Sequence, residues 1–124
     1  MREPTFLILT ALAGSPRHGY GIVQEIQTLS DGRVSLLTGT LYTALDRLTA
    51  EGLVEHDRDE EVDGRVRHYY RLTAQGLTAL TAETARLRHL TTAAEDRLRA
   101  LRPGFKNSRL LEAQFAVCAA IGPC

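Results

Sequence analysis

Gly39-Thr-Leu-Tyr-Thr-Ala-Leu-Asp-Arg-Leu-Thr-Ala-Glu-Gly-Leu-Val54 is the stretch that decides the fold of this chain. Leu41, Leu45 and Leu48 recur in it at helical spacing, which predicts one buried face. Small polar residues occupy the opposite surface, so this helix is suited to lie in a DNA major groove. Gly52 is expected to end the helix, because a left-handed residue is least strained without a Cβ. The apolar pair that follows begins an extended segment.

Two further helices are predicted upstream. The run from Pro4 to Ala13 is apolar nearly all round, as expected of a helix buried both in its own core and against a second subunit. Ser15-Pro16 predicts an N-cap followed by proline at the first helical position, and the second helix is expected to run from about His18 to Leu29. Gly19 and Gly21 in its first turn indicate close backbone approach, either to another helix, which we favour, or to phosphate. This second helix, a turn and the helix that begins near Gly39 follow one another in the order of a helix-turn-helix, in which the later helix reads the DNA.

A β-hairpin is predicted next, because two extended runs between positions 53 and 73 flank Asp63-Gly64. On the returning run, strand alternation places Arg65, Arg67 and Arg71 on one face. Arginines on one side of a hairpin suit contact with phosphates and the minor groove. The alternative is that they pair across the ladder with acidic residues of the first run, and both can hold for different arginines. Those acidic residues are Glu55, Asp57 and Asp59.

The last predicted helix runs from Ala74 to Arg102 and would be ~43 Å long, which exceeds the needs of one small domain. Leucines recur along it in a heptad pattern with a more polar middle. We therefore expect it to form a dimer, with packing inside one chain as the alternative. The residues expected at the dimer interface are Phe6, Leu9, Leu77, Leu80, Leu87, Leu98 and Leu101.

The composition is that of an ordinary globular protein, with 124 residues, 44% of them apolar and 24% charged. No stretch approaches the roughly 18 consecutive apolar residues of a membrane span, and no secretory signal is visible. The two cysteines lie at the far C-terminus without metal-type spacing to histidine, so a reducing cytoplasm is the expected location.

The charge distribution is the main objection to a DNA-binding function. Net charge is zero, and residues 41–76 carry five basic against eight acidic side chains. Binding to DNA depends on local rather than total charge. The acidic residues gather between Glu55 and Asp63, so the hypothesis requires that the acidic strand face away from the duplex.

Catalytic chemistry is not indicated, and we expect no enzyme activity, no cofactor and no metal site. The sequence contains no P-loop, dinucleotide-binding loop or nucleophile elbow. The histidines have no partner at i+4 and no nearby cysteine, so each is expected to be a surface or packing residue. They are His18, His56, His68 and His89.

Several short motifs occur in the order and spacing of one protein family. They are His18-Gly19-Tyr20-Gly21-Ile22, Gly39-Thr40-Leu41-Tyr42, Ala44-Leu45, Arg47-Leu48, Glu51-Gly52-Leu53-Val54, Asp63-Gly64-Arg65, Arg67, Tyr69-Tyr70-Arg71-Leu72-Thr73 and Gly76. Through them, roughly residues 5–102 resemble the PadR family of transcriptional regulators. The resemblance implies a mainly α (α+β) fold, a winged helix-turn-helix with a two-stranded wing and a long C-terminal helix that forms a homodimer together with the first helix. Family members usually repress transcription, and many release DNA when a small molecule binds.

This resemblance also organises the chain and its candidate site. It implies a winged helix-turn-helix domain at 1–73 and a dimerisation helix at 74–102, followed by an extension at 103–124 that forms a short helix or a frayed tail. Tyr42 would contact the DNA backbone, and the hairpin would be the wing. The chain has no tryptophan, on which some relatives stack flat ligands. The residues expected to bind DNA are Thr38, Gly39, Thr40, Tyr42, Thr43, Arg47, Gly64, Arg65 and Arg67.

The sequence thus predicts a dimeric, sequence-specific regulator that binds an inverted-repeat operator. The resemblance implies a repressor with a small-molecule effector. One alternative is a winged-helix protein–protein interaction module without DNA binding, motivated by the acidic run. A third hypothesis is a small-molecule carrier that uses the dimer pore.

Overall fold

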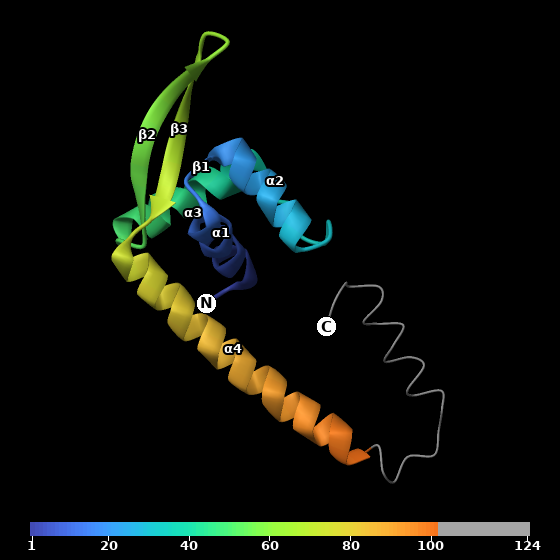
Figure 1. Ribbon diagram of the computed structural model, residues 1–124. Coiled ribbons are helices and arrows are strands. Elements are labelled where there is room, and N and C mark those ends of the chain that lie inside the picture. Colours follow the sequence, from blue (N-terminus) through green and yellow to red (C-terminus); the bar gives the residue numbers. More distant parts are fainter. Residues whose placement is uncertain (102–124) are drawn as a thin grey trace. The chain divides into compact units, whose positions relative to one another are not determined.

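The computed structural model describes residues 1–101 (Figure 1), so the extension expected at 103–124 lies outside the described residues. Four helices and a small sheet make up this part of the chain. In order they are α1 (Glu3–Gly14), β1 (Arg17–His18), α2 (Gly19–Leu29), α3 (Thr38–Ala50), β2 (Val54–Val62), β3 (Arg65–Leu72) and α4 (Ala74–Leu101). None of these helices is long and apolar enough to cross a membrane.

The core lies where α1, α2 and α3 meet the base of the sheet. The three leucines of α3 are completely buried there, as their spacing predicts. Apolar side chains of α1 and α2 surround them, and burial of this kind contributes roughly 1.5–3 kcal/mol per large side chain. The buried core residues are Ile8, Leu9, Ala11, Leu12, Ile22, Ile26, Leu41, Leu45, Leu48, Val54 and Leu80.

The start of α2 differs from the prediction. Ser15-Pro16 does not begin the helix, because Arg17–His18 is extended and pairs with Tyr69 and Tyr70 of β3. Arg17 also donates from Nε to the carbonyl oxygen of Ala11 at 3.0 Å. The helix therefore starts only at Gly19.

The end of α3 and the hairpin turn are as predicted. Gly52 has a φ of +79°, and the Leu53 N–H donates to the Leu48 carbonyl at 3.0 Å, which closes a Schellman motif. Asp63 and Gly64 both have positive φ, as a tight turn between antiparallel strands requires.

The sheet has the strand order β1-β3-β2 and is antiparallel throughout. The hairpin of β2 and β3 extends beyond the helices as the wing (Figure 1). One irregularity interrupts its ladder: His56 pairs with Tyr70 and Arg58 pairs with Tyr69, so β2 holds one extra residue between them. This β-bulge changes which side chains share a face of β2.

The beginning of α4, up to Thr84, belongs to the same compact unit as the rest of the domain, Met1–Thr84. Thr73 Oγ1 accepts a hydrogen bond from the Gly76 N–H at 2.9 Å and donates one to the Gly52 carbonyl at 2.6 Å. Thr73 therefore caps the start of α4 and also links it to Gly52, which follows α3.

Two of the residues expected at a dimer interface do not fit that role. Leu9 is 0% exposed and Leu80 is 8% exposed, because both belong to the core of a single chain. Both side chains belong to the same buried cluster as the three leucines of α3. Phe6 is partly buried against the same core, whereas Leu77, Leu98 and Leu101 remain about half exposed.

Candidate nucleic-acid interface

The outer surface of α3 carries the polar residues that the sequence assigns to DNA. All nine of the predicted DNA-binding residues are exposed, six on α3 and three on the wing. They do not form one continuous pocket. Those on α3 divide between the side that faces the wing and the side that faces α1.

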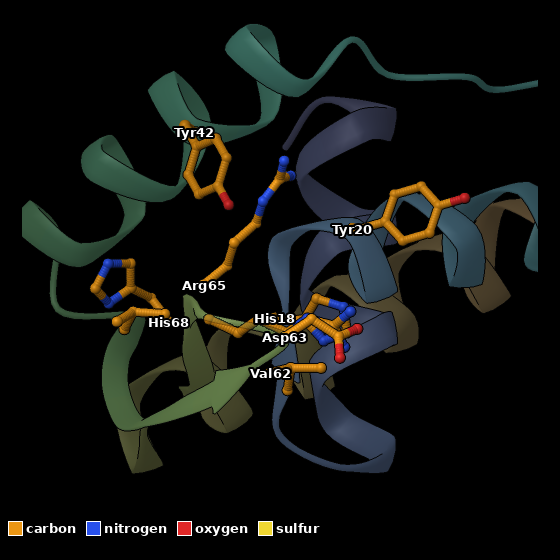
Figure 2. Close-up of a pocket in the computed structure, with 9 residues that line it drawn as sticks. His18, Tyr20, Tyr42, Val62, Asp63, Arg65 and His68 are labelled. Atoms are coloured by element: carbon orange, nitrogen blue, oxygen red, sulfur yellow. The ribbon is translucent and has the colours of Figure 1, made fainter.

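On the side of the wing, α2, α3 and the hairpin enclose a pocket of about 570 Å³ (Figure 2). Its lining is rich in groups that bind phosphate: guanidinium, phenol and imidazole side chains. In Figure 2 the Tyr42 side chain extends from α3 toward the part of the pocket where Arg65 lies. The lining residues are His18, Tyr20, Tyr42, Val62, Asp63, Arg65, Val66, Arg67 and His68.

Tyr42 is fixed by close packing against the start of α2. A Cβ placed on Gly19 would lie 2.5 Å from the Tyr42 hydroxyl oxygen and 2.8 Å from the ring carbon that carries it. A side chain at position 19 would have to displace the Tyr42 ring, so glycine allows this tyrosine to pack closely against the start of α2. Of the two explanations for close approach at Gly19, packing against a neighbouring helix is the observed one.

His18 and Tyr20 line the same pocket but were not among the predicted site residues. His18 stacks against Tyr69 with ring centroids 5.3 Å apart. Burial, followed by the nearby positive charge of Arg67, lowers the pKa of His18 below its usual value of 6.5. The available signal was the motif His18-Gly19-Tyr20-Gly21, whose glycine spacing marked the segment without indicating where its side chains point.

The wing arginines fall into two groups. Arg71 donates to Glu55 at 2.7 Å and to Asp57 at 3.1 Å, so for this residue pairing across the ladder is the correct alternative. Within residues 1–101, Arg65 and Arg67 have no ion-pair partner and both line the pocket. Arg67 lies opposite Glu60 in the ladder and attracts its carboxylate, so Arg65 is the arginine with the greater capacity to bind an anion.

The acidic run of β2 is largely paired within the wing itself. Glu55 and Asp57 pair with Arg71, and Arg58 donates to Glu60 at 3.0 Å. The same Arg58 guanidinium lies 4.2 Å from the centre of the Tyr69 ring. Pairing of this kind reduces the repulsion that these carboxylates would exert on phosphate.

On the side of α1, a second concavity of about 710 Å³ is lined by Gly39, Thr40, Thr43 and Arg47 together with the start of α1. Arg47 donates to the Thr5 hydroxyl at 2.9 Å and to Glu51 at 3.3 Å. Thr43 donates its hydroxyl hydrogen to the Gly39 carbonyl at 3.0 Å. In this state the Thr43 oxygen presents acceptor lone pairs, which match the amino groups of adenine and cytosine.

Within residues 1–101, four helices, a three-stranded antiparallel sheet and a projecting hairpin define a winged helix-turn-helix. Residues 8–82 match the family model described as the transcriptional regulator PadR-like family, and the chain belongs to this family. The assignment makes the chain a transcriptional regulator rather than an enzyme.

Individual relatives agree with this assignment. A protein described as transcriptional regulator Rv3488 of Mycobacterium tuberculosis is 40% identical over 83 residues, which cover 67% of this chain and 74% of that protein. The crystal structure of a PadR family transcription regulator from Clostridium difficile R20291 is similar with a TM-score of 0.65 at 26% identity, covering 76% of this chain and 96% of that one.

One solved structure of similar fold includes DNA. It is Bacillus subtilis PadR in complex with operator DNA, with a TM-score of 0.60 at 24% identity over 67% of this chain and 48% of that chain. At this level of identity the likeness concerns the fold.

Proposed function

We propose that this protein is a homodimeric, sequence-specific DNA-binding regulator that occupies an inverted-repeat operator and acts in the cytoplasm. The observation that carries the proposal is the placement of Tyr42, Arg65 and Arg67 around one pocket beside the exposed face of α3. A phosphate of the DNA backbone at this pocket would meet two unpaired guanidinium groups and a phenol.

In this proposal the two sides of α3 have different roles. Thr38, Gly39, Thr40, Thr43 and Arg47 approach the base edges in the major groove, and Tyr42 binds the backbone. The wing, through Gly64, Arg65 and Arg67, binds phosphates or the adjacent minor groove. The operator DNA in the Bacillus subtilis PadR structure supports the same use of the fold.

Dimer formation is proposed through exposed leucines of α4. Leu77, Leu90, Leu98 and Leu101 are among the exposed large apolar side chains. From Leu87 onward, apolar residues recur every three or four positions, a spacing that places them on one helical stripe. The stripe favours association with a second α4, in which Leu90 is added to the predicted residues Leu77, Leu87, Leu98 and Leu101.

By resemblance to its family, we further propose that the protein represses transcription and releases its operator DNA when a small molecule binds. The absence of tryptophan means that an effector would not bind by stacking on an indole ring. The protein–protein interaction hypothesis was based on unpaired acidic charge, and the ion pairs of Arg58 and Arg71 remove most of that basis.

The experiment that tests this proposal is selection of bound sequences from a random DNA pool. We expect an inverted repeat whose half-sites are about one helical turn apart, ~34 Å, because the two reading helices of a dimer are related by a twofold axis. Recovery of a single half-site would contradict the dimeric arrangement, and absence of any enriched sequence would contradict sequence-specific binding.

A further inference from the structure

Two histidines and one carboxylate of the wing converge on a single point. His56 and Asp59 come from β2, and His68 comes from β3. Asp59 Oδ1 lies 2.7 Å from His56 Nε2 and 2.7 Å from His68 Nδ1. All three potential ligand atoms lie within 4.8 Å of one another. This group does not belong to the ion pairs of Arg58 and Arg71 described above.

The β-bulge creates this convergence. In a regular strand, residues three positions apart such as His56 and Asp59 point to opposite faces. Because β2 holds one extra residue between His56 and Arg58, His56 and Asp59 lie on the same face of the hairpin. Asp59 is then directly opposite His68 in the ladder, so three residues from separate parts of the hairpin share one surface.

We propose that His56, Asp59 and His68 form a binding site for a divalent transition-metal ion, with zinc as the best match. Two imidazole nitrogens and a carboxylate oxygen form a ligand set that zinc uses in proteins. Ligand bonds of about 2.0–2.1 Å in tetrahedral geometry place ligand atoms roughly 3.3 Å apart. The two 2.7 Å contacts at Asp59 would lengthen slightly to reach that separation, and the two imidazole nitrogens, which lie within 4.8 Å of each other, would move closer together.

The surroundings of the three residues favour an ion that arrives from solvent. Each side chain is about half exposed, so neither entry of the ion nor a water molecule as fourth ligand is obstructed. Glu61 and Asp63 add negative charge nearby on the same hairpin. A bound ion would link β2 to β3 across the wing, and the site requires neither DNA nor a second subunit.

Zinc binding by the full-length chain tests this inference directly. Zinc chloride is titrated calorimetrically into the C118S/C124S variant, which removes the cysteine thiols as competing ligands. We expect saturation at one ion per chain. His56→Ala and His68→Ala should each weaken binding by at least about tenfold, since changes outside the ligand shell alone often cost that much.

His89→Ala is the matched control, because it removes an exposed histidine from α4 and should leave zinc affinity unchanged. A second readout is the histidine region of a heteronuclear NMR spectrum, in which zinc should shift the ring signals of His56 and His68 and not those of His18. The inference is overturned if the C118S/C124S variant shows no saturable binding up to millimolar zinc. It is equally overturned if the His56 and His68 variants bind zinc as tightly as their parent.

Discussion

The Cα of Gly19 lies against the phenol of Tyr42, close enough that a methyl group at position 19 would be 2.5 Å from the Tyr42 hydroxyl oxygen. This contact connects the first residue of α2 to the reading helix. Tyr42 is also partly exposed to solvent and lines the pocket beside Arg65. The backbone at Gly19 therefore sets the direction in which the proposed phosphate-binding hydroxyl points.

Gly19→Ala tests that relationship. Because the crowded atoms are at the end of a partly exposed side chain, the ring can move outward, and we expect a change in unfolding free energy within about 1 kcal/mol. DNA affinity should nevertheless fall by about tenfold, the loss expected for one hydrogen bond to a charged group. Fluorescence anisotropy measures the affinity and urea denaturation measures the stability.

A double-mutant cycle with Tyr42→Phe tests whether Gly19→Ala lowers DNA affinity through the Tyr42 hydroxyl. If Gly19 acts through the Tyr42 hydroxyl, the double variant should bind DNA about as well as Tyr42→Phe alone. Fully additive losses would show that Gly19 affects DNA binding by another route.

Gly76→Ala should be far more damaging to stability. A Cβ at this position would lie 2.0 Å from the carbonyl oxygen of Leu53, a backbone atom held where α4 joins the end of α3. Overpacking against backbone should cost about 3 kcal/mol, at the upper end of the usual range. Urea denaturation should show a lower midpoint, whereas Gly14→Ala, whose nearest neighbour is 3.8 Å away, should leave the midpoint nearly unchanged. Equal midpoints for the two variants would contradict the close contact.

The wing arginines should respond unequally to neutralisation. Arg65→Gln and Arg67→Gln should each weaken binding to all DNA sequences and reduce the slope of log affinity against log salt by about 1, since each removes one phosphate contact. Arg71→Gln is the matched control, because this guanidinium is already paired with Glu55 and Asp57. A salt slope that changes most in Arg71→Gln would place the DNA near the base of the wing rather than near its turn.

His18 should titrate below the ordinary histidine range. Burial, and secondarily the charge of Arg67, lower its pKa, so the folded state favours the neutral ring. The associated stability is present above the unfolded value of about 6.5 and is lost as pH falls through the folded pKa. NMR titration should give a depressed pKa for His18, and Arg67→Gln should raise it part of the way toward 6.5. An unchanged pKa in that variant would exclude Arg67 as a contributor.

Much of this fold follows from local sequence rules. The leucine spacing of α3, Gly52 after it, and the Asp63-Gly64 turn each specify a backbone conformation through neighbouring residues only. The start of α2 does not follow from such rules, since the extended backbone of Arg17–His18 depends on pairing with β3, a segment distant in sequence.

The same distinction separates the predicted from the unpredicted parts of the candidate site. Exposure of Tyr42 and Arg65 follows from helical and strand periodicity. The convergence of His56 with His68 does not, because strict alternation assumes a regular strand and the bulge in β2 alters it. Burial of Leu80 in the core of its own chain was also missed, since a heptad pattern reveals an apolar stripe and not whether its partner is the same chain.

The most direct test of the central claim is fluorescence anisotropy of the purified protein with DNA from upstream of its own gene, at two salt concentrations. We predict tight binding that prefers an inverted repeat over a random duplex and weakens steeply at higher salt. A folded, dimeric protein that binds its upstream DNA no better than a random duplex would contradict the account.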